Sequence, residues 1–199
     1  MPRMKTDDID KFFEYGISLP TRTIYMGSMA GGDDESGVDA TMAEYAVKGL
    51  HVLDQANNTA DPKPIKVILS TIGGYVYHGM CIYDAIHMCR SYVTVTTFGP
   101  CMSMGSIILQ AADKRIMTEN STLMIHYGTT GIIDMHAPTA YKWAEENKRN
   151  DVWMENLFLA KIREKHPKFT QKKLREWLMS DTFFTAEEAV HWGFADEVG

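Results

Sequence analysis

The chain has 199 residues, of which 45% are hydrophobic and 23% are charged, and it carries a formal net charge of −6. The length and the apolar share suit one globular domain with a sizeable buried core, while the negative charge argues against nucleic acid as a partner. No apolar run approaches the roughly 20 residues that a membrane-spanning helix needs, so a membrane is not an expected partner either.

The first two thirds of the chain alternate between strand and helix patterns. Residues 65–70, IKVILS, form a continuous apolar run that is typical of a strand buried on both faces. Residues 31–37, GGDDESG, predict a flexible acidic loop. The predicted elements are a helix over 7–15, a strand over 22–27, a helix over 41–57 that opens with a capping box at Thr41 and Glu44, the strand over 65–70, a helix over 75–90, a strand over 92–98, a helix over 104–112 and a strand over 122–127. This alternation favours parallel βαβ units.

The pattern changes to mainly helical after residue 128. A long helix is predicted from Thr139 to about His166, where Pro167 stops it, and TQKKLREWLMS predicts a shorter one. These two helices are interpreted as an appendage to the sheet domain. A capping box that starts at Thr185 opens a last short helix. The long helix carries more large apolar side chains than we expect it to bury in its own chain, which predicts an oligomer interface; they are Trp143, Val152, Trp153, Leu157, Phe158 and Ile162.

The three cysteines are an odd number without the spacing of a disulfide framework. If Cys81 and Cys89 share a helix, they lie about 12 Å apart, too far for a disulfide. The N-terminal run MPRMKTDDIDKFF has no apolar segment of the kind found in signal peptides. We therefore expect free thiols and a reducing compartment, the cytoplasm. We expect no cofactor and no metal.

The run GPCMSMGS, residues 99–106, lies between a predicted strand and a predicted helix. Ligand sites of parallel sheets lie at the carboxyl ends of the strands, so Ser103 would hold its hydroxyl out at that edge. The N–H of Met104 would be an unpaired donor of the helix N-terminus, a type of donor that can hold an oxyanion. Gly99 and Gly105 leave room for a second backbone to approach. The composition therefore suits a nucleophile turn, although it does not match the G-x-S-x-G motif.

Each of these residues also has a purely structural interpretation. A serine at a strand-to-helix turn commonly serves as an N-cap. The glycines of IGGY, residues 72–75, commonly make tight turns, although they could also supply a second oxyanion N–H. A strand-end histidine such as His126 is more often structural than a base, and a carboxylate such as Asp181 is more often a cap or solvated. Spacing alone leaves both interpretations open.

Four sequence runs occur in an order and a spacing that point to one family. They are STIGGYVYHGMCIYDAI, GPCMSMGSIILQAADKR, STLMIH and SDTFFTAEEAVHWGFAD. These runs resemble S-P-G-G-x-V, G-x-A-S-M-G, x-x-M-I-H and R-D-x-F-x-x-x-E-A-x-x-x-G-x-x-D of the ClpP family, the proteolytic subunits of Clp proteases. Each run alone is weakly specific, but four in register over residues 20–199 are strongly specific.

This resemblance implies an α/β fold and an assembly. The implied fold is a spiral of ββα units, similar to that of crotonases, with a helical handle. Residues 1–199 would form a single peptidase domain, with a head over about 20–126 and 181–199 and a handle over about 127–180. The handle of the family stacks two heptameric rings, so a homo-oligomer is expected.

The resemblance also implies a serine peptidase. Matched residue by residue, Ser103 corresponds to the nucleophile, His126 to the general base and Asp181 to the carboxylate that orients it. Gly74 and Met104 correspond to the two oxyanion-hole amides. This set of roles is the Ser-His-Asp triad, which is defined by geometry and not by chain order.

The chain departs from the family pattern at several positions. Ile72 stands where the family has proline, and Met102 stands where it has alanine. Tyr127 and Gly128 replace a Gln-Pro pair after the histidine, on the strand that should line the peptide site. Ser180 replaces the arginine that in the family couples ring contact to an active triad, which predicts a single ring or a salt-sensitive double ring. The departures indicate a divergent member of the family and leave open whether the chain is cellular or viral.

The function expected from the sequence is hydrolysis of peptides and unfolded proteins inside a ring, without ATP. The chain has no G-x-x-x-x-G-K-[ST] motif, so folded substrates would need a separate Clp-type AAA+ ATPase that unfolds them. Two other functions share part of this pattern. A non-catalytic ring subunit would typically have lost a triad residue, and a crotonase-type acyl-CoA enzyme uses paired backbone amides without a serine triad.

Overall fold

The computed structural model describes residues 5–27, 37–55, 62–129 and 136–199. Within these ranges the elements are α1 (Thr6–Tyr15), β1 (Ile17–Ser18), β2 (Thr23–Met26), α2 (Ala40–Gln55), β3 (Ile65–Thr71), α3 (Val76–His87), β4 (Val93–Met102), α4 (Met104–Leu109), β5 (Lys114–Met117), β6 (Thr122–Ile125), α5 (Ala137–Lys165), α6 (Gln171–Leu178), β7 (Thr182–Phe184), α7 (Ala186–Trp192) and β8 (Glu197–Val198). The predicted acidic loop over 31–37 and the predicted end of the helix at 57 lie largely outside the described residues.

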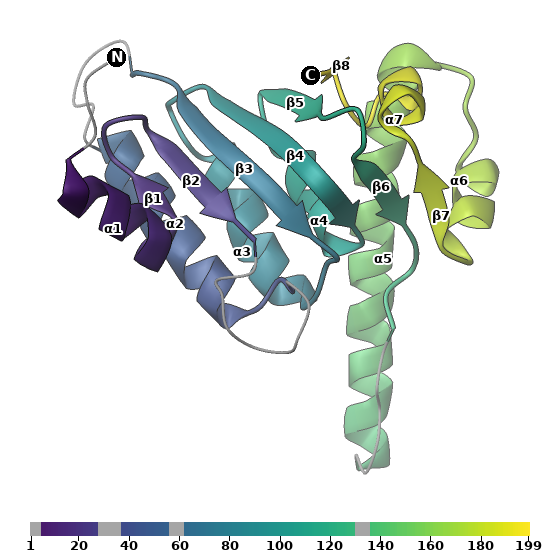
Figure 1. The fold of residues 1–199 in the computed structure, drawn as a ribbon. Helices are drawn as coiled ribbons and strands as arrows, with labels where there is room; N and C mark the ends of the chain where they lie inside the picture. Colours follow the sequence, from purple (N-terminus) through teal and green to yellow (C-terminus); the bar gives the residue numbers. More distant parts are fainter. Residues whose placement is uncertain (1–4, 28–36, 56–61, 130–135) are drawn as a thin grey trace.

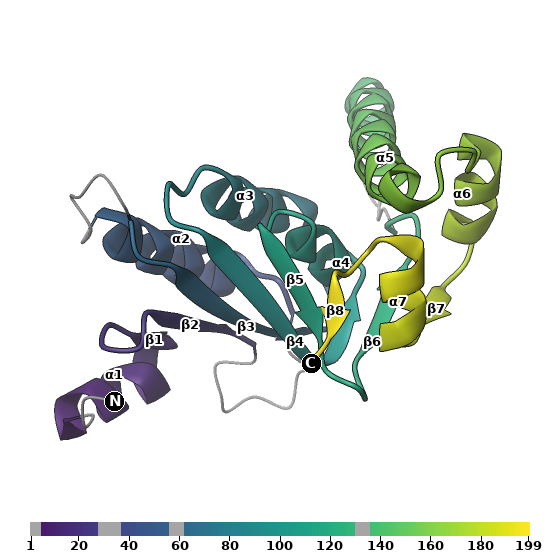
Figure 2. The same ribbon diagram turned by 90° about the horizontal axis from the view of Figure 1, so that it is seen from above.

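One sheet organises the fold, with strands in the order β1-β2-β3-β4-β5-β8. The pairs from β2 to β5 and the pair of β5 with β8 run parallel, as the alternating pattern predicted. Helices α2 and α3 lie side by side across one face (Figures 1 and 2). Alternate side chains of β3, among them Val67 and Leu69, are buried, whereas Lys66 on the other face is exposed and Ile68 is half-buried. The prediction that this strand is buried on both faces was therefore wrong, because only one of its faces is fully covered. The predicted α/β fold is confirmed.

Strand β4 divides the sheet in two, and this explains the composition of its end. Its first half, Thr94 to Thr97, pairs with β5, whereas Pro100 to Met102 pair with β6. Gly99 lies between the halves with a φ of 69°, which lets the strand turn from one partner to the other. The prediction that the strand ends at residue 98 was therefore wrong, since the run read as a turn is its second half.

Helix α5 has two unlike halves. Its C-terminal half contributes Met154, Phe158, Leu159 and Ile162 to the core, and Phe158 packs edge-on against Phe194. Residues 137–150 contribute no buried side chain, and in Figure 1 this half projects beyond the sheet. Neither α5 nor any other described helix combines the length and the apolarity needed to cross a membrane.

The expectation for the apolar side chains of α5 was therefore only partly right. Phe158 and Ile162 are buried in the chain itself, and Trp153 and Leu157 pack against its core. Trp143 and Val152 are each 42% exposed.

Helix starts and very short strands were the least predictable elements. Helix α2 begins after Asp39, whose carboxylate accepts a hydrogen bond from the N–H of Met42 at 2.8 Å, so the predicted capping box at Thr41 was wrong. Helix α5 begins at Ala137 rather than at Thr139. The capping box at Thr185 is confirmed. The strands β1, β5, β7 and β8 have only two to four residues each and were not predicted.

Candidate active site

Ser103 stands at the junction of β4 and α4 in an unusual backbone conformation. Its φ of 50° and ψ of −118° are uncommon for a residue with a side chain. The backbone around it is well held, because its N–H donates to the carbonyl of Met124 at 2.9 Å and its carbonyl accepts from the hydroxyl of Ser106 at 2.6 Å. The Ser103 side chain makes no capping hydrogen bond to α4. Ser103 is therefore the N-cap residue of α4 by position, but its side chain does not cap the helix.

Strand pairing brings Ser103, His126 and Asp181 together. Parallel pairing of Met102 with Met124 places the residues that follow β4 and β6 at the same edge of the sheet. Antiparallel pairing of Ile125 with Thr182 places the next pair, His126 and Asp181, opposite each other. The Nε2 atom of His126 lies 2.8 Å from the Oγ atom of Ser103, and its Nδ1 atom lies 2.8 Å from Oδ1 of Asp181.

The three side chains differ in exposure. The His126 side chain is 22% exposed, whereas that of Asp181 is 57% exposed. The backbone around Asp181 is held by its neighbour in the chain. The hydroxyl of Thr182 donates to the carbonyl of Trp177 in α6 at 2.7 Å. The arrangement is a continuous hydrogen-bonded chain that runs from a half-buried serine to an exposed carboxylate.

The glycine turn after β3 packs directly against Ser103. Gly73 has a φ of 102°, and a Cβ atom added there would lie 2.5 Å from the Cβ atom of Ser103. Gly74 pairs with Val38 as an isolated bridge, and a Cβ atom on Gly74 would lie 2.5 Å from the Val38 carbonyl oxygen. Among the described residues, none accepts a backbone hydrogen bond from the N–H of Gly74 or Met104. Two backbone donors therefore remain on the two segments that flank Ser103.

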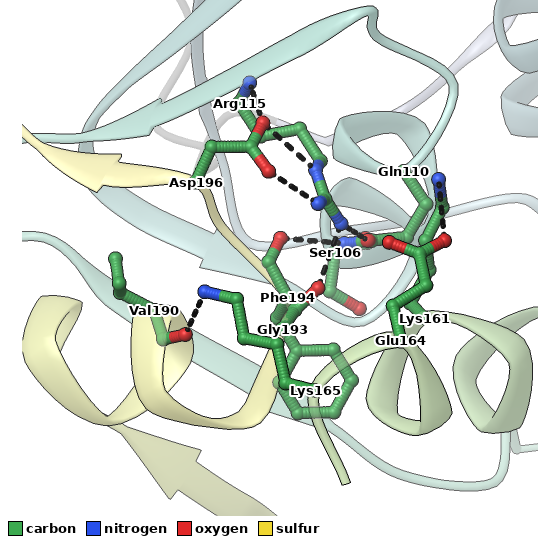
Figure 3. A network of polar contacts seen from close by, with 10 residues as sticks. All are labelled: Ser106, Gln110, Arg115, Lys161, Glu164, Lys165, Val190, Gly193, Phe194 and Asp196. Carbon is green, nitrogen blue, oxygen red and sulfur yellow. Dashed lines mark hydrogen bonds and ion pairs between the residues drawn. The ribbon is translucent and has the colours of Figure 1, made fainter. Parts of the chain in front are cut away.

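A polar network ties the Ser103 turn to the C-terminal segment (Figure 3). The Gln110 side-chain amide donates to the carbonyl of Ser106 at 3.0 Å and to that of Phe194 at 3.2 Å. Arg115 donates to Gln110 at 2.8 Å and forms an ion pair with Asp196 at 2.5 Å. Burial opposes the charge on Asp196, but the hydrogen bonds and charge of Arg115 outweigh it and hold the pKa of that carboxyl below its ordinary value.

A second polar cluster holds the segment after His126 against α5 and α6. The Tyr127 hydroxyl donates to Glu155 at 2.5 Å, and Arg175 donates to both oxygens of Glu155, at 3.1 and 2.9 Å. Burial and the bond to Glu155 raise the pKa of Tyr127 to about 12. Burial opposes the charge on Glu155, yet its hydrogen bonds to Tyr127, Gln171 and Arg175 lower its pKa. Sequence reasoning missed this cluster, and its only signal was the departure of Tyr127 from the family pattern.

A cleft of about 270 Å³ opens beside Ser103 and His126. One side is lined by apolar side chains of α3 and α4, including Met80 and Ile107, and the other side is formed by α5 with Asn147, Asn150, Asp151, Trp153 and Met154. A substrate in this cleft would contact Ser103 between an apolar wall and a wall that carries both polar and apolar side chains.

Comparison of the sequence with known proteins identifies the family to which this chain belongs. The family model described as Clp protease matches residues 34–199. A curated relative, the ATP-dependent Clp protease proteolytic subunit of Deinococcus radiodurans, is 32% identical over 186 residues, which cover 92% of this chain and 83% of that protein. The matched region contains Ser103, His126 and Asp181. On these matches, the chain belongs to the Clp protease family.

Proposed function

We propose that the protein is a serine endopeptidase that acts as the proteolytic subunit of a Clp-type protease. The observation that carries the proposal is the hydrogen-bonded chain from Ser103 through His126 to Asp181, at 2.8 Å for each contact, on the edge of an open cleft. A hydroxyl bonded to an imidazole that a carboxylate orients is the arrangement that activates serine as a nucleophile. We assign the three residues the roles of nucleophile, general base and orienting carboxylate.

The reaction follows from this geometry. The Ser103 oxygen forms a bond to the peptide carbonyl carbon while His126 Nε2 takes the hydroxyl proton. Asp181 holds the Nδ1 proton and stabilises the imidazolium. The tetrahedral intermediate collapses when the C–N bond breaks and His126 gives its proton to the leaving amine. Water then attacks the acyl-enzyme, again with His126 as base, and releases the acid and Ser103.

The backbone N–H groups of Gly74 and Met104 are proposed to hold the oxyanion of each tetrahedral intermediate. They belong to the two segments that meet at Ser103, and the contact of Gly73 with Ser103 keeps these segments close. Gly79 adds to this packing, because a Cβ atom there would meet the Met104 side chain. Removing one oxyanion donor typically costs about 10²–10³ in rate, so the position of these amides matters.

We further propose that the protein assembles as a ring with residues 127–180 as its handle, and that it acts on peptides and unfolded proteins. Support comes from the half of α5 over 137–150, which has no buried side chain and exposes Tyr141 and Trp143. Large exposed aromatic side chains commonly mark interfaces. A single ring or a salt-sensitive double ring is proposed because Ser180 replaces an arginine. Folded substrates are proposed to need a Clp-type ATPase.

Labelling with a fluorophosphonate tests the catalytic role. The probe should form one adduct per chain on Ser103, and the Ser103→Ala variant should not react. Ser106 is the matched comparison, because it lies three residues away but is fully buried. An adduct on Ser106, or labelling that persists in Ser103→Ala, would refute the assignment, and a folded chain that never reacts would support a non-catalytic subunit.

The enclosed ring is tested with one reporter protein in its folded and permanently unfolded forms, without ATP. The unfolded form should be cut and the folded form spared. Equal cleavage at matched concentration would refute the enclosure. Mass photometry at low and high salt measures the assembly, and a monomer at every concentration would refute the ring.

A further inference from the structure

The cleft beside Ser103 has one feature that the proposed reaction does not use. Five residues of α5 line the cleft, at positions 147, 150, 151, 153 and 154, and those at 147, 150, 151 and 154 have a spacing that puts them on one side of a helix. Three of them are polar, and Asp151 alone among the cleft-lining residues carries a carboxylate. The cleft volume of about 270 Å³ is just below the roughly 300 Å³ at which pockets for whole ligands begin, so it suits a single substrate side chain.

Asp151 takes part in none of the ion pairs found among the described residues, and two arginines of α5 and α6 pair with other carboxylates. Arg149 pairs with Glu146 at 2.6 Å, and Arg175 pairs with Glu155 at 2.9 Å. Burial, with a further contribution from Glu155, raises the pKa of Asp151 above its ordinary value. A half-buried carboxylate without a counter-charge is destabilised, and a cation that entered the cleft would relieve this.

The other walls of the cleft complement a long basic side chain. Met80 and Ile107 offer an apolar surface for its methylene groups, which such side chains bury readily. The side-chain carbonyl of Asn150 can accept a hydrogen bond from an N–H group that a carboxylate leaves unbound. A guanidinium has five N–H groups in a planar fork, so it can use more of these acceptors than an ammonium.

We propose that Asp151 makes this cleft specific for substrates with a basic side chain, arginine before lysine, on the residue whose carbonyl Ser103 attacks. The inference rests on the proposed peptidase function and adds the substrate class to it. Asp151 is a binding residue in this proposal and takes no part in the proton transfers.

A series of fluorogenic peptides tests the preference. The peptides are identical except for the residue that precedes the fluorescent amide, which is Arg, Lys, Leu or Glu. For the wild-type assembly we expect kcat/KM to fall in that order, with Arg exceeding Leu by about 10-fold to 100-fold, the range of a charge-assisted hydrogen bond. In Asp151→Asn the ratio of Arg to Leu should fall by about the same factor, and in Asp151→Lys the Glu peptide should be preferred over the Arg peptide.

The control is Glu145→Gln, which removes the same charge from an exposed position of α5 outside the cleft. Its Arg-to-Leu ratio should equal that of the wild type, whereas an equal fall in both variants would mean that only the general negative field attracts the peptide. Fluorophosphonate labelling of every variant separates the two proposals. If Ser103 is labelled and Leu is cleaved as well as Arg, the specificity proposal is wrong and the peptidase stands. If Ser103 is not labelled and no peptide is cut, the peptidase proposal fails as well.

Discussion

The two ends of the proposed triad are held in different ways. Ser103 is fixed from inside the fold, by the backbone of β6, by the buried hydroxyl of Ser106, and through Gln110 and Arg115 by the C-terminal segment. Asp181 is exposed, and its segment depends on short contacts to α6. The nucleophile end is thus fixed by buried groups around it, whereas the carboxylate end belongs to a surface segment between α6 and β7.

This difference suggests which part of the site can respond to its surroundings. A side chain held by a buried network moves only when the network breaks, because interiors are closely packed. A carboxylate on a surface segment can change its position at small cost. Assembly through the handle would therefore act on Asp181 and leave Ser103 unchanged.

The largest loss of turnover should come from removing either the Ser103 hydroxyl or the His126 imidazole. Ser103→Ala and His126→Ala should each lower kcat for a short peptide by about 10³-fold or more, because either change abolishes the activated nucleophile. Thermal unfolding should show that both variants remain folded. Ser180→Ala, which alters an exposed serine beside Asp181, should keep wild-type turnover. Residual activity within tenfold of the wild type in Ser103→Ala would mean that another residue is the nucleophile.

The carboxylate end should be less critical. Asp181→Asn should lower kcat by about 10²-fold, less than the about 10⁴-fold loss for a buried triad aspartate, because solvent reaches this side chain and partly replaces its charge. The measurement is steady-state turnover of the same peptide across salt concentrations. A loss as large as that of Ser103→Ala would show that the exposed position of Asp181 is not its working environment, as expected if a neighbouring subunit covers it.

The buried network should matter for stability. Arg115→Met removes one partner of an ion pair whose arginine side chain is only 5% exposed, so the free energy of unfolding should fall by about 2–4 kcal/mol. Arg149→Met breaks an exposed ion pair on α5 and should cost less than about 0.5 kcal/mol. Urea unfolding measures both. Equal losses in the two variants would contradict the view that the Ser103 side is fixed from within.

The smallest effect should be a pH dependence of stability that comes from Glu155. The pKa of Glu155 is lower in the folded protein than its ordinary value of 4.5, so the unfolded chain binds the proton more readily than the folded one. The stability that Glu155 contributes is therefore complete above pH 4.5 and is lost as the pH falls through the lowered pKa. The melting temperature should drop in this acidic range, and the drop should be shallower in Glu155→Gln. Asp196, whose pKa is also lowered, should supply part of the slope that remains. An identical slope in the variant would exclude Glu155 as a contributor.

The sequence predicted the main strands and helices because these have long periodic or continuous apolar patterns, as in residues 65–70. Motifs in a fixed order also singled out Ser103, His126 and Asp181, which hydrogen bonds join in the structure. Their contacts could not be derived from spacing, because they depend on the registers of Met102 with Met124 and of Ile125 with Thr182. The start of α2 depended on which of two nearby residues caps the helix. Asp39 caps α2 in place of Thr41 because its carboxylate reaches the N–H of Met42.

Contacts between distant segments were beyond the reach of sequence patterns. Tyr127 and Glu155 are 28 residues apart, and nothing in either segment predicts that a tyrosine hydroxyl would meet a buried carboxylate there. The same is true of Gln110, whose two acceptors lie on segments far apart in the chain. Contacts between side chains of distant elements depend on how those elements pack together. A local sequence pattern carries no information about that packing.

The positive φ of Ser103 has a consequence for how such a chain can evolve. At φ 50° and ψ −118° a serine costs about 1–3 kcal/mol relative to a residue that adopts this conformation freely, and glycine is that residue. Under selection for abundance alone, Ser103→Gly would be a favourable mutation, because it would raise the melting temperature as it removed the hydroxyl. In a copy of this chain that served only as scaffold, Ser103→Gly would therefore be favoured because it stabilises the fold. Selection for a catalytic hydroxyl would oppose this substitution.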